Sequence, residues 1–290
     1  MALLHTIPQQ DATEAAQQMS VHAYFPPFSY DQEDAQPILI KEARNVLVRG
    51  NNVGLRTWEA SLRLACYLFS RPELVANKGV IELGAGTGLL PLLCTGFLGA
   101  HPVLATDGLA QVLDGLQTNI GLNQHLFRDR TQPAARLLDW TEPLELQAIL
   151  PDFESLGKFE MILGADITYS PTILQPLAEL LGLLVDRYPG IDILISATIR
   201  NVETMRRFFE ICELDLHFTV KRVPFDPGQQ TGFFHSVATE IAIYTLWRVP
   251  EGCSKMEEMF ELKWKSEKFD FDTDFMPSAS PGVRHGKSAW

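Results

Sequence analysis

The chain has 290 residues, of which 46% are hydrophobic and 21% are charged. These fractions are close to the average of folded domains, and they exclude a disordered or fibrous chain. The 24 Lys and Arg residues against 36 Asp and Glu residues give a formal net charge of −12. Nucleic-acid-binding surfaces are usually basic, and no basic cluster here is longer than Arg206 and Arg207. We therefore expect no nucleic-acid partner.

The cysteines do not form a recognisable site, because Cys66, Cys94, Cys212 and Cys253 are far apart and include no C-x-x-C pair. We therefore expect neither disulfides nor a bound metal. No secretion signal is recognisable at the N-terminus, so the cytoplasm is the expected compartment. Residues 83–106 form 24 uncharged residues, but five glycines and two prolines argue against a membrane helix there.

The first part of the chain is predicted to be peripheral. Residues 1–45 are polar with scattered aromatic residues, and we interpret them as an accessory segment with some helix near 11–19. Two roles stay open for this segment: part of a substrate platform, or a cover over an exposed sheet edge. The apolar residues of 57–70 follow helical spacing, which predicts an amphipathic helix that ends before Pro72.

From residue 80 onward, segments typical of strands alternate with segments typical of helices. This alternation predicts an α/β sheet covered by helices on both faces. The Ser170 hydroxyl and the Asn201 amide are predicted to cap the helices that follow them. The predicted strands are 80–83, 102–106, 135–138, 159–165 and 191–197, and the predicted helices are 89–98, 109–122, 171–185 and 201–212.

The last two strands are predicted at 216–223 and 238–248, joined by a turn-rich loop. They indicate a C-terminal antiparallel hairpin, so the expected fold is α/β with a doubly wound, mostly parallel, seven-stranded Rossmann-like sheet. We expect residues 46–250 to form the main domain. Residues 251–290 are expected to be a peripheral tail with some helix near 256–264.

A glycine-rich turn lies between the first strand of this domain and the next helix, with the sequence Glu82-Leu83-Gly84-Ala85-Gly86-Thr87-Gly88. Glycines let the backbone turn tightly and let a ligand approach it closely. A dinucleotide fingerprint would need a small residue at position 89, where the chain has Leu89, and this disfavours a dehydrogenase. The pattern E-x-G-x-G-x-G fits better the S-adenosylmethionine loop of class I methyltransferases. Glu82 would then hold the cationic amino-acid end of the cofactor; a turn without a ligand is the alternative.

Two further candidates for cofactor binding follow the next two strands. Asp107 lies 23 residues after Gly84, at a strand end where a carboxylate can accept both ribose hydroxyls. An ordinary Asp-Gly turn is the alternative there. Trp140 offers a flat apolar surface to an adenine, and its alternative role is that of a core tryptophan.

The fourth strand ends in Gly164-Ala165-Asp166-Ile167-Thr168-Tyr169. Ligands of such sheets bind at the carboxyl ends of the strands, so a nucleophile should meet the methyl group here. Asp166 is the candidate that orients an incoming amine, and Tyr169 is a candidate wall of its channel. The alternative is that this Asp and Tyr belong to a helix cap.

Together these motifs resemble the seven-strand protein-lysine methyltransferases called methyltransferase family 16, over about residues 45–250. The D-x-x-Y step at the fourth strand is the diagnostic one. The resemblance implies that Trp58, Gly84, Ala85, Gly86, Asp107, Trp140 and Ala165 contact S-adenosylmethionine, and that Asp166 and Tyr169 face the target lysine. The stretches that carry it are Arg56-Thr57-Trp58-Glu59-Ala60, Ile81 to Gly88, Thr106-Asp107, Leu138-Asp139-Trp140 and Ala165 to Tyr169.

Within that family, residues 54–60 and 197–201 are most similar to the branch that methylates translation elongation factor 2. The resemblance therefore implies this factor as protein substrate, and we expect a monomer. Three alternatives stay open: a methyltransferase acting on another protein, one acting on a small molecule, and a non-catalytic adaptor that binds the cofactor. No His or Cys lies within the Asp166 motif, so the lysine is expected to lose its proton to solvent.

Overall fold

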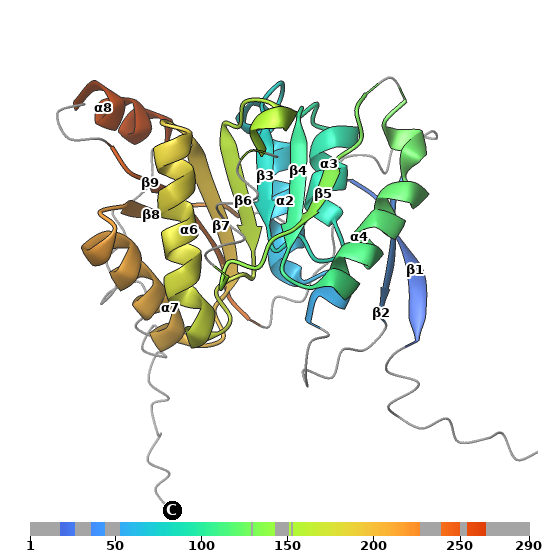
Figure 1. The fold of residues 1–290 in the computed structure, drawn as a ribbon, viewed down its shortest axis with the longest axis horizontal. Coiled ribbons are helices and arrows are strands. Elements are labelled where there is room, and N and C mark those ends of the chain that lie inside the picture. The colour runs from blue at the N-terminus through green and yellow to red at the C-terminus, as the bar shows by residue number, and fades with distance from the viewer. Residues whose placement is uncertain are drawn as a thin grey trace, which may run out of the picture.

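The computed structural model describes residues 18–26, 36–43, 53–128, 130–142, 151, 153–226, 239–249 and 254–264. A seven-stranded sheet lies between helices, and a separate two-stranded sheet lies beside them (Figure 1). The strands of the large sheet are β3 (Val80–Leu83), β4 (Val103–Asp107), β5 (Ala134–Leu137), β6 (Met161–Ala165), β7 (Asp192–Thr198), β8 (Thr219–Val223) and β9 (Ile241–Trp247).

The strand order is β5-β4-β3-β6-β7-β9-β8. The first five of these strands are parallel, whereas β9 is antiparallel to both β7 and β8. In chain order, β4 and β5 are added on one side of β3, and β6 then pairs with the other side of β3. The fold class and the closing hairpin predicted from the sequence are confirmed. The switch of direction between β3 and β6 is where ligands bind in sheets of this kind, at the carboxyl ends of the strands.

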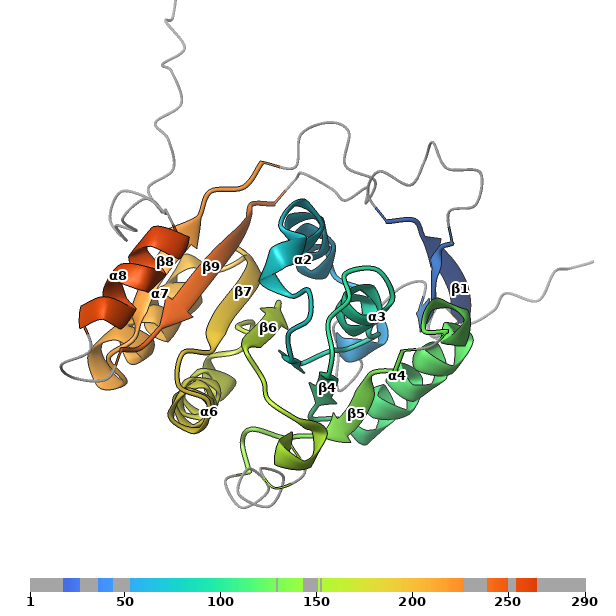
Figure 2. The same ribbon diagram turned by 90° about the horizontal axis from the view of Figure 1, so that it is seen from above.

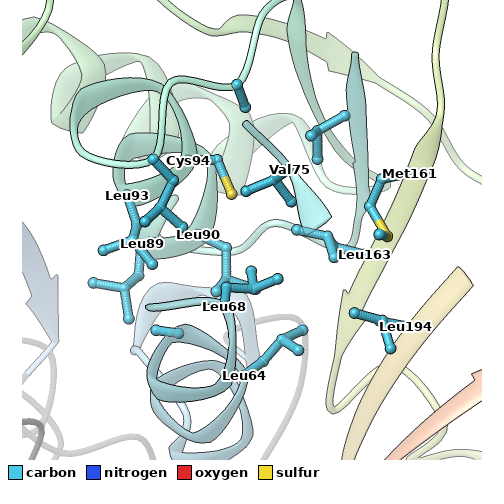
Figure 3. Close-up of a cluster of buried hydrophobic side chains, with 14 of the residues drawn as sticks. Leu64, Leu68, Val75, Leu89, Leu90, Leu93, Cys94, Met161, Leu163 and Leu194 are labelled. Atoms are coloured by element: carbon cyan, nitrogen blue, oxygen red, sulfur yellow. The ribbon is translucent and has the colours of Figure 1, made fainter. Parts of the chain in front are cut away.

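Helices cover both faces of the sheet (Figure 2). On one face lie α2 (Glu59–Ser70), α3 (Leu89–Gly96) and α4 (Ala110–Leu122), and on the other lie α6 (Leu174–Arg187) and α7 (Val202–Glu210). Leu68 and Leu90 pack with Leu163 on the first face (Figure 3), whereas the neighbouring Ile162 packs in the cluster on the second face. Successive side chains of a strand point to opposite faces. A central parallel strand covered on both faces therefore reads as a continuous apolar run, which is why these strands were predictable.

Two helix starts were predicted from capping residues, and one of them is wrong. Asn201 does cap α7, since its Oδ1 accepts a hydrogen bond from the Thr204 N–H at 3.1 Å. Ser170 makes no such bond; its hydroxyl lies 3.0 Å from the Thr172 hydroxyl, and a 3-10 turn (η4, Pro171–Ile173) precedes α6. The Ile173 N–H, which such a cap could bind, donates to the Ser170 backbone carbonyl at 3.2 Å.

The N-terminal segment contains a hairpin that was not predicted. Strands β1 (Met19–Tyr24) and β2 (Ile38–Ala43) pair antiparallel in a sheet of their own. The helix expected near 11–19 is wrong at Met19, which begins β1, and residues 11–17 lie outside the described part of the chain.

Side chains of α4 and of the residue that follows it hold this hairpin in place. The Asn119 Oδ1 accepts the Lys41 N–H at 2.8 Å. Four residues later, the Asn123 amide accepts the Leu39 N–H at 2.8 Å and donates to the Leu39 carbonyl at 2.7 Å. The two asparagines thus bond to β2 as a neighbouring strand would. The hairpin is attached to α4 and adds no strand to the large sheet. Both roles considered for the N-terminal segment stay predictions.

The predicted C-terminal helix is confirmed as α8 (Ser254–Lys263). The Trp264 Nε1–H donates to Asp192 Oδ1 at 3.2 Å, and Lys263 pairs with the other carboxylate oxygen of Asp192. Phe260 stacks on Trp247 with ring centroids 5.6 Å apart. Asp192 begins β7, so α8 lies at the end of the sheet opposite to the carboxyl ends of the parallel strands. Among the described residues, no helix is long and apolar enough to cross a membrane.

Trp264 is 3% exposed, so the Trp264→Ala substitution removes a large buried side chain. We expect it to lower the free energy of unfolding by about 3–5 kcal/mol, because a cavity replaces the ring. Urea denaturation measures this difference. Met259→Ala on the same helix is the control: Met259 is 69% exposed, and its loss should change stability by less than about 0.5 kcal/mol. Equal effects of the two variants would contradict the docking of α8.

Candidate functional site

The predicted glycine turn follows β3 directly and leads into α3. Gly84, Gly86 and Gly88 have φ angles of +65°, +53° and +89°, in the left-handed region that favours glycine. Neighbouring side chains also lie close to two of these glycines. A Cβ at Gly84 would lie 2.7 Å from Ile167 Cγ2, and one at Gly88 would lie 2.3 Å from Leu116 Cδ1. The turn is therefore specified by its backbone conformation and by the side chains around it.

A cleft of about 30 Å³ opens at this turn. Residues of α2, of the turn and of α3 line it. Six of the lining residues are predicted cofactor residues, namely Trp58, Glu82, Gly84, Ala85, Gly86 and Ala165.

The two remaining predicted cofactor residues lie against the same turn. Asp107 Oδ2 accepts the Gly86 N–H at 3.0 Å. A Cβ at Gly84 would lie 3.4 Å from the ring of Trp140. The structure therefore brings all eight predicted residues together around the turn.

The Asp107 carboxylate keeps unused acceptor capacity. It accepts two backbone N–H bonds, from Gly86 at 3.0 Å and from Leu109 at 3.2 Å. An ionised carboxylate offers about four acceptor positions, so two donors of a ligand could still be bound. Burial raises the pKa of Asp107, and the backbone N–H groups around it oppose that rise.

Glu82 carries a buried acceptor that no described residue satisfies. The side chain is 2% exposed, and its Oε2 has no hydrogen-bond partner among the residues that the structure describes. Burial raises the pKa of Glu82 well above its ordinary value, and the nearby charge of Asp107 adds to this rise. Ionisation of this buried side chain is therefore costly, and a cationic donor bound in the cleft would lower that cost.

A second cleft, of about 50 Å³, begins at the next residue of the chain, because Ala165 lines the first cleft and Asp166 lines the second. The Asp166 carboxylate accepts the Thr198 N–H at 2.7 Å and the Thr198 hydroxyl at 2.9 Å. The φ of Asp166 is +55°, a strained conformation of the kind that clusters at functional sites. These bonds tie Asp166 to the end of β7 and not to the helix that follows, unlike a helix cap.

Arg200 contacts one lining residue of each cleft. Its Nη2 lies 3.4 Å from Asp166 Oδ2, and its guanidinium carbon lies 5.2 Å from the centre of the Trp58 ring. The ring itself is fixed by a hydrogen bond of 2.7 Å from its Nε1–H to the Val53 carbonyl. The roles of Arg200 and Thr198 were not predicted, although both lie in residues 197–201, which carry the resemblance to one branch of the family. The available signal was their place directly at the end of a buried strand.

Tyr169 lies in the wall of the second cleft, as predicted, and is 57% exposed. Partial burial raises the pKa of its hydroxyl, and the charges of Asp107 and Asp139 add to the rise. Ile167, between Asp166 and Tyr169, has a role that was not predicted. A Cβ at Gly164 would lie 2.4 Å from Ile167 Cδ1, so both Gly164 and Gly84 leave room for this side chain. Ile167 thereby packs the two loops against each other.

The site combines the switch point of a parallel sheet, a glycine turn with acidic residues on both sides, and an adjoining cleft with a carboxylate. These are the features expected of a class I methyltransferase that uses S-adenosylmethionine. The chain belongs to the family described as lysine methyltransferase, which its residues 35–215 match. It is therefore a protein-lysine methyltransferase, as the sequence motifs predicted.

Curated proteins similar to this chain are named as protein-lysine methyltransferases. The chain is 36% identical over 250 residues to protein-lysine N-methyltransferase EFM3 of Chaetomium thermophilum, covering 86% of this chain and 74% of that protein. It is 28% identical over 196 residues to protein-lysine N-methyltransferase EEF2KMT of Mus musculus, covering 64% of this chain and only 56% of the mouse protein.

A solved precorrin-6y C5,15-methyltransferase from Geobacter metallireducens is 14% identical, with a TM-score of 0.45, over 72% of this chain and 93% of that one.

The raised pKa of Glu82 predicts how stability depends on pH. The ordinary pKa is 4.5, so above about pH 4.5 the folded chain keeps a proton that the unfolded chain loses. The free energy of unfolding therefore falls as the pH rises. Glu82→Gln cannot ionise, so the stability of this variant relative to the wild type should increase between pH 5 and pH 8. Urea denaturation at several pH values checks this.

Glu73→Gln is the control for that experiment. Glu73 is exposed, and its hydrogen bond with Arg71 lowers its pKa. Its folded-state stabilisation is present above the unfolded pKa, so this substitution should not raise relative stability at high pH. Parallel curves for Glu82→Gln and the wild type would mean that Glu82 ionises in the folded chain as readily as in the unfolded one.

Proposed function

We propose that this lysine methyltransferase modifies a lysine of translation elongation factor 2, in the cytoplasm. The observation that carries the proposed site is the Asp166 carboxylate, which is fixed at the boundary between the two clefts. The choice of substrate is supported by the similarity of residues 54–60 and 197–201 to the branch that acts on this factor. The name of the mouse relative, EEF2KMT, contains the abbreviation of the same factor.

The cofactor is proposed to bind in the cleft at the glycine turn. The unpaired Oε2 of Glu82 would accept a hydrogen bond from the ammonium group of S-adenosylmethionine, and the free acceptor positions of Asp107 would accept the ribose hydroxyls. Trp140 would lie beside the adenine. Trp58, Ala165 and the backbone of residues 84–86 would complete the contacts. When bound, the cofactor supplies an electrophilic methyl group on a sulfonium.

Asp166 is proposed to orient the target lysine. Its carboxylate already accepts two hydrogen bonds from Thr198, and its third contact, with Arg200 at 3.4 Å, is long for a hydrogen bond. A lysine N–H can take that third position, which aims the nitrogen lone pair away from the carboxylate. Tyr169 would form one wall of the entrance. Such alignment of reacting atoms accounts for much of the rate of a displacement reaction.

The lysine must be neutral to react, and no residue that lines either cleft is a histidine or a cysteine. The proton is therefore proposed to leave for solvent at the entrance, where Tyr169 is exposed. A desolvated position next to a cation disfavours the ammonium form. The Asp166 carboxylate favours that form, so we assign it orientation and not proton removal.

The Asp166→Asn variant tests this role. We expect turnover to fall by at least about a hundredfold while the Kd for S-adenosylmethionine stays within about threefold of the wild type, because Asp166 lies in the second cleft. Isothermal titration measures the binding, and transfer of labelled methyl groups measures turnover. Asp186→Asn is the control, since this exposed carboxylate pairs with Arg248 outside both clefts. Loss of cofactor binding together with turnover would contradict the role.

The substrate is tested by incubating the protein and labelled S-adenosylmethionine with a cytosolic extract that lacks the endogenous enzyme. We expect one labelled protein, identified by mass spectrometry as elongation factor 2, and no label with Asp166→Ala. Label on another protein would keep the lysine methyltransferase and discard this substrate. Label in small molecules alone would contradict a protein substrate.

A further inference from the structure

We infer that the N-terminal hairpin is a working part of the cofactor site: Glu42 and Asn119 are positioning residues that hold Thr57 and Thr87 in place at the cleft. The inference rests on the proposed binding of the cofactor at the glycine turn. Neither Glu42 nor Asn119 lines that cleft, so both act through the residues they bind.

The first link runs from Glu42 of β2 to the start of α2. Glu42 is 3% exposed, and its Oε2 accepts the Thr57 N–H at 2.6 Å. Its other oxygen accepts the Tyr24 hydroxyl of β1 at 2.6 Å. A buried carboxylate is stable only where donors surround it, and here the donors come from two separate parts of the chain. The hairpin and the entry to α2 are thereby joined.

Thr57 carries this link into the cleft. Its hydroxyl lies 2.8 Å from the hydroxyl of Thr87 in the glycine turn, and both threonines are buried. Thr57 and Thr87 line the cleft together with Trp58, which follows Thr57 in the chain. One hydrogen bond therefore links Glu42 to Thr57, and a second links Thr57 to Thr87 on the glycine turn.

Asn119 of α4 provides the second link. Its Oδ1 accepts the Lys41 N–H of β2 at 2.8 Å, and its Nδ2 donates to the Thr87 carbonyl at 2.8 Å. One buried amide thus bonds the hairpin and the glycine turn. Because Lys41 precedes Glu42, both links start from the same two residues of β2.

Asn123 offers a natural comparison. It is as buried as Asn119, directly follows the same helix as its C-cap and bonds the same strand, through Leu39. Its remaining bond, at 2.8 Å, is to the backbone carbonyl of Asn119 and not to the glycine turn. Loss of Asn123 should loosen the hairpin as much as loss of Asn119, without releasing Thr87 directly.

The experiment measures the Kd for S-adenosylmethionine by titration calorimetry in the full chain. Glu42→Ala and Asn119→Ala are each expected to weaken binding by about tenfold, since small displacements of a preorganised site are costly. Glu42→Gln should stay within about threefold of the wild type, because its amide can accept from Thr57 and donate to the Tyr24 oxygen. Asn123→Ala should lower the Tm about as much as Asn119→Ala but leave the Kd unchanged. At saturating cofactor, kcat should be preserved in all four.

If Asn119→Ala and Asn123→Ala weaken cofactor binding equally, the effect comes from loosening of the hairpin alone. This result would overturn the inference. Asp107→Ala tests the cleft itself. If it weakens binding while Glu42→Ala and Asn119→Ala do not, only the inference fails; if it has no effect, the proposed cleft fails as well. Should Glu42→Ala not fold, Thr87→Val removes the hydroxyl contact with little change of shape and is expected to weaken binding in the same way.

Discussion

The site depends on the parallel pairing of β3 with β6, in which Leu83 stands opposite Gly164. This register places the residues after both strands side by side at one edge of the sheet. The glycine turn and Asp166 therefore face neighbouring clefts although more than 70 residues separate them in the sequence. Ile167 fits between Gly84 and Gly164, so a Cβ at either glycine would force the Ile167 side chain to shift. The relative position of the two clefts therefore depends on the pairing of β3 with β6.

The parts of the fold that the sequence predicted are those in which local pattern and burial agree. Strand β3 was predicted at its observed bounds, because it is buried on both faces and ends in glycines. The candidate residues also lie where the motifs placed them, but their roles remain predictions, as does the division of the chain at residues 45 and 250. The hairpin was missed because β1 is a short, largely exposed strand. Its attachment depends on asparagines about 80 residues further along, and no local pattern reports such a contact.

The same limit explains Arg200. Its position after β7 was visible in the sequence, but its two contacts come from the residue before α2 and the residue after β6, which only the folded sheet brings together. The observed hairpin also changes how the N-terminal region is understood. The family match begins at residue 35, so it includes β2 and Glu42. Residues that looked peripheral because of their polar composition supply a buried carboxylate to the interior.

The Arg200 guanidinium, held between a carboxylate and an aromatic ring, has a consequence for how a lysine would enter. In the proposed mechanism a protonated lysine would take the position of a cation that already lies 3.4 Å from Asp166, so the charge beside that carboxylate would not change. The two cations differ in one respect: a guanidinium does not lose its proton in a protein, whereas a lysine ammonium can. In the proposed mechanism Arg200 would therefore occupy the position of the substrate ammonium but could not become the neutral amine that a lysine becomes.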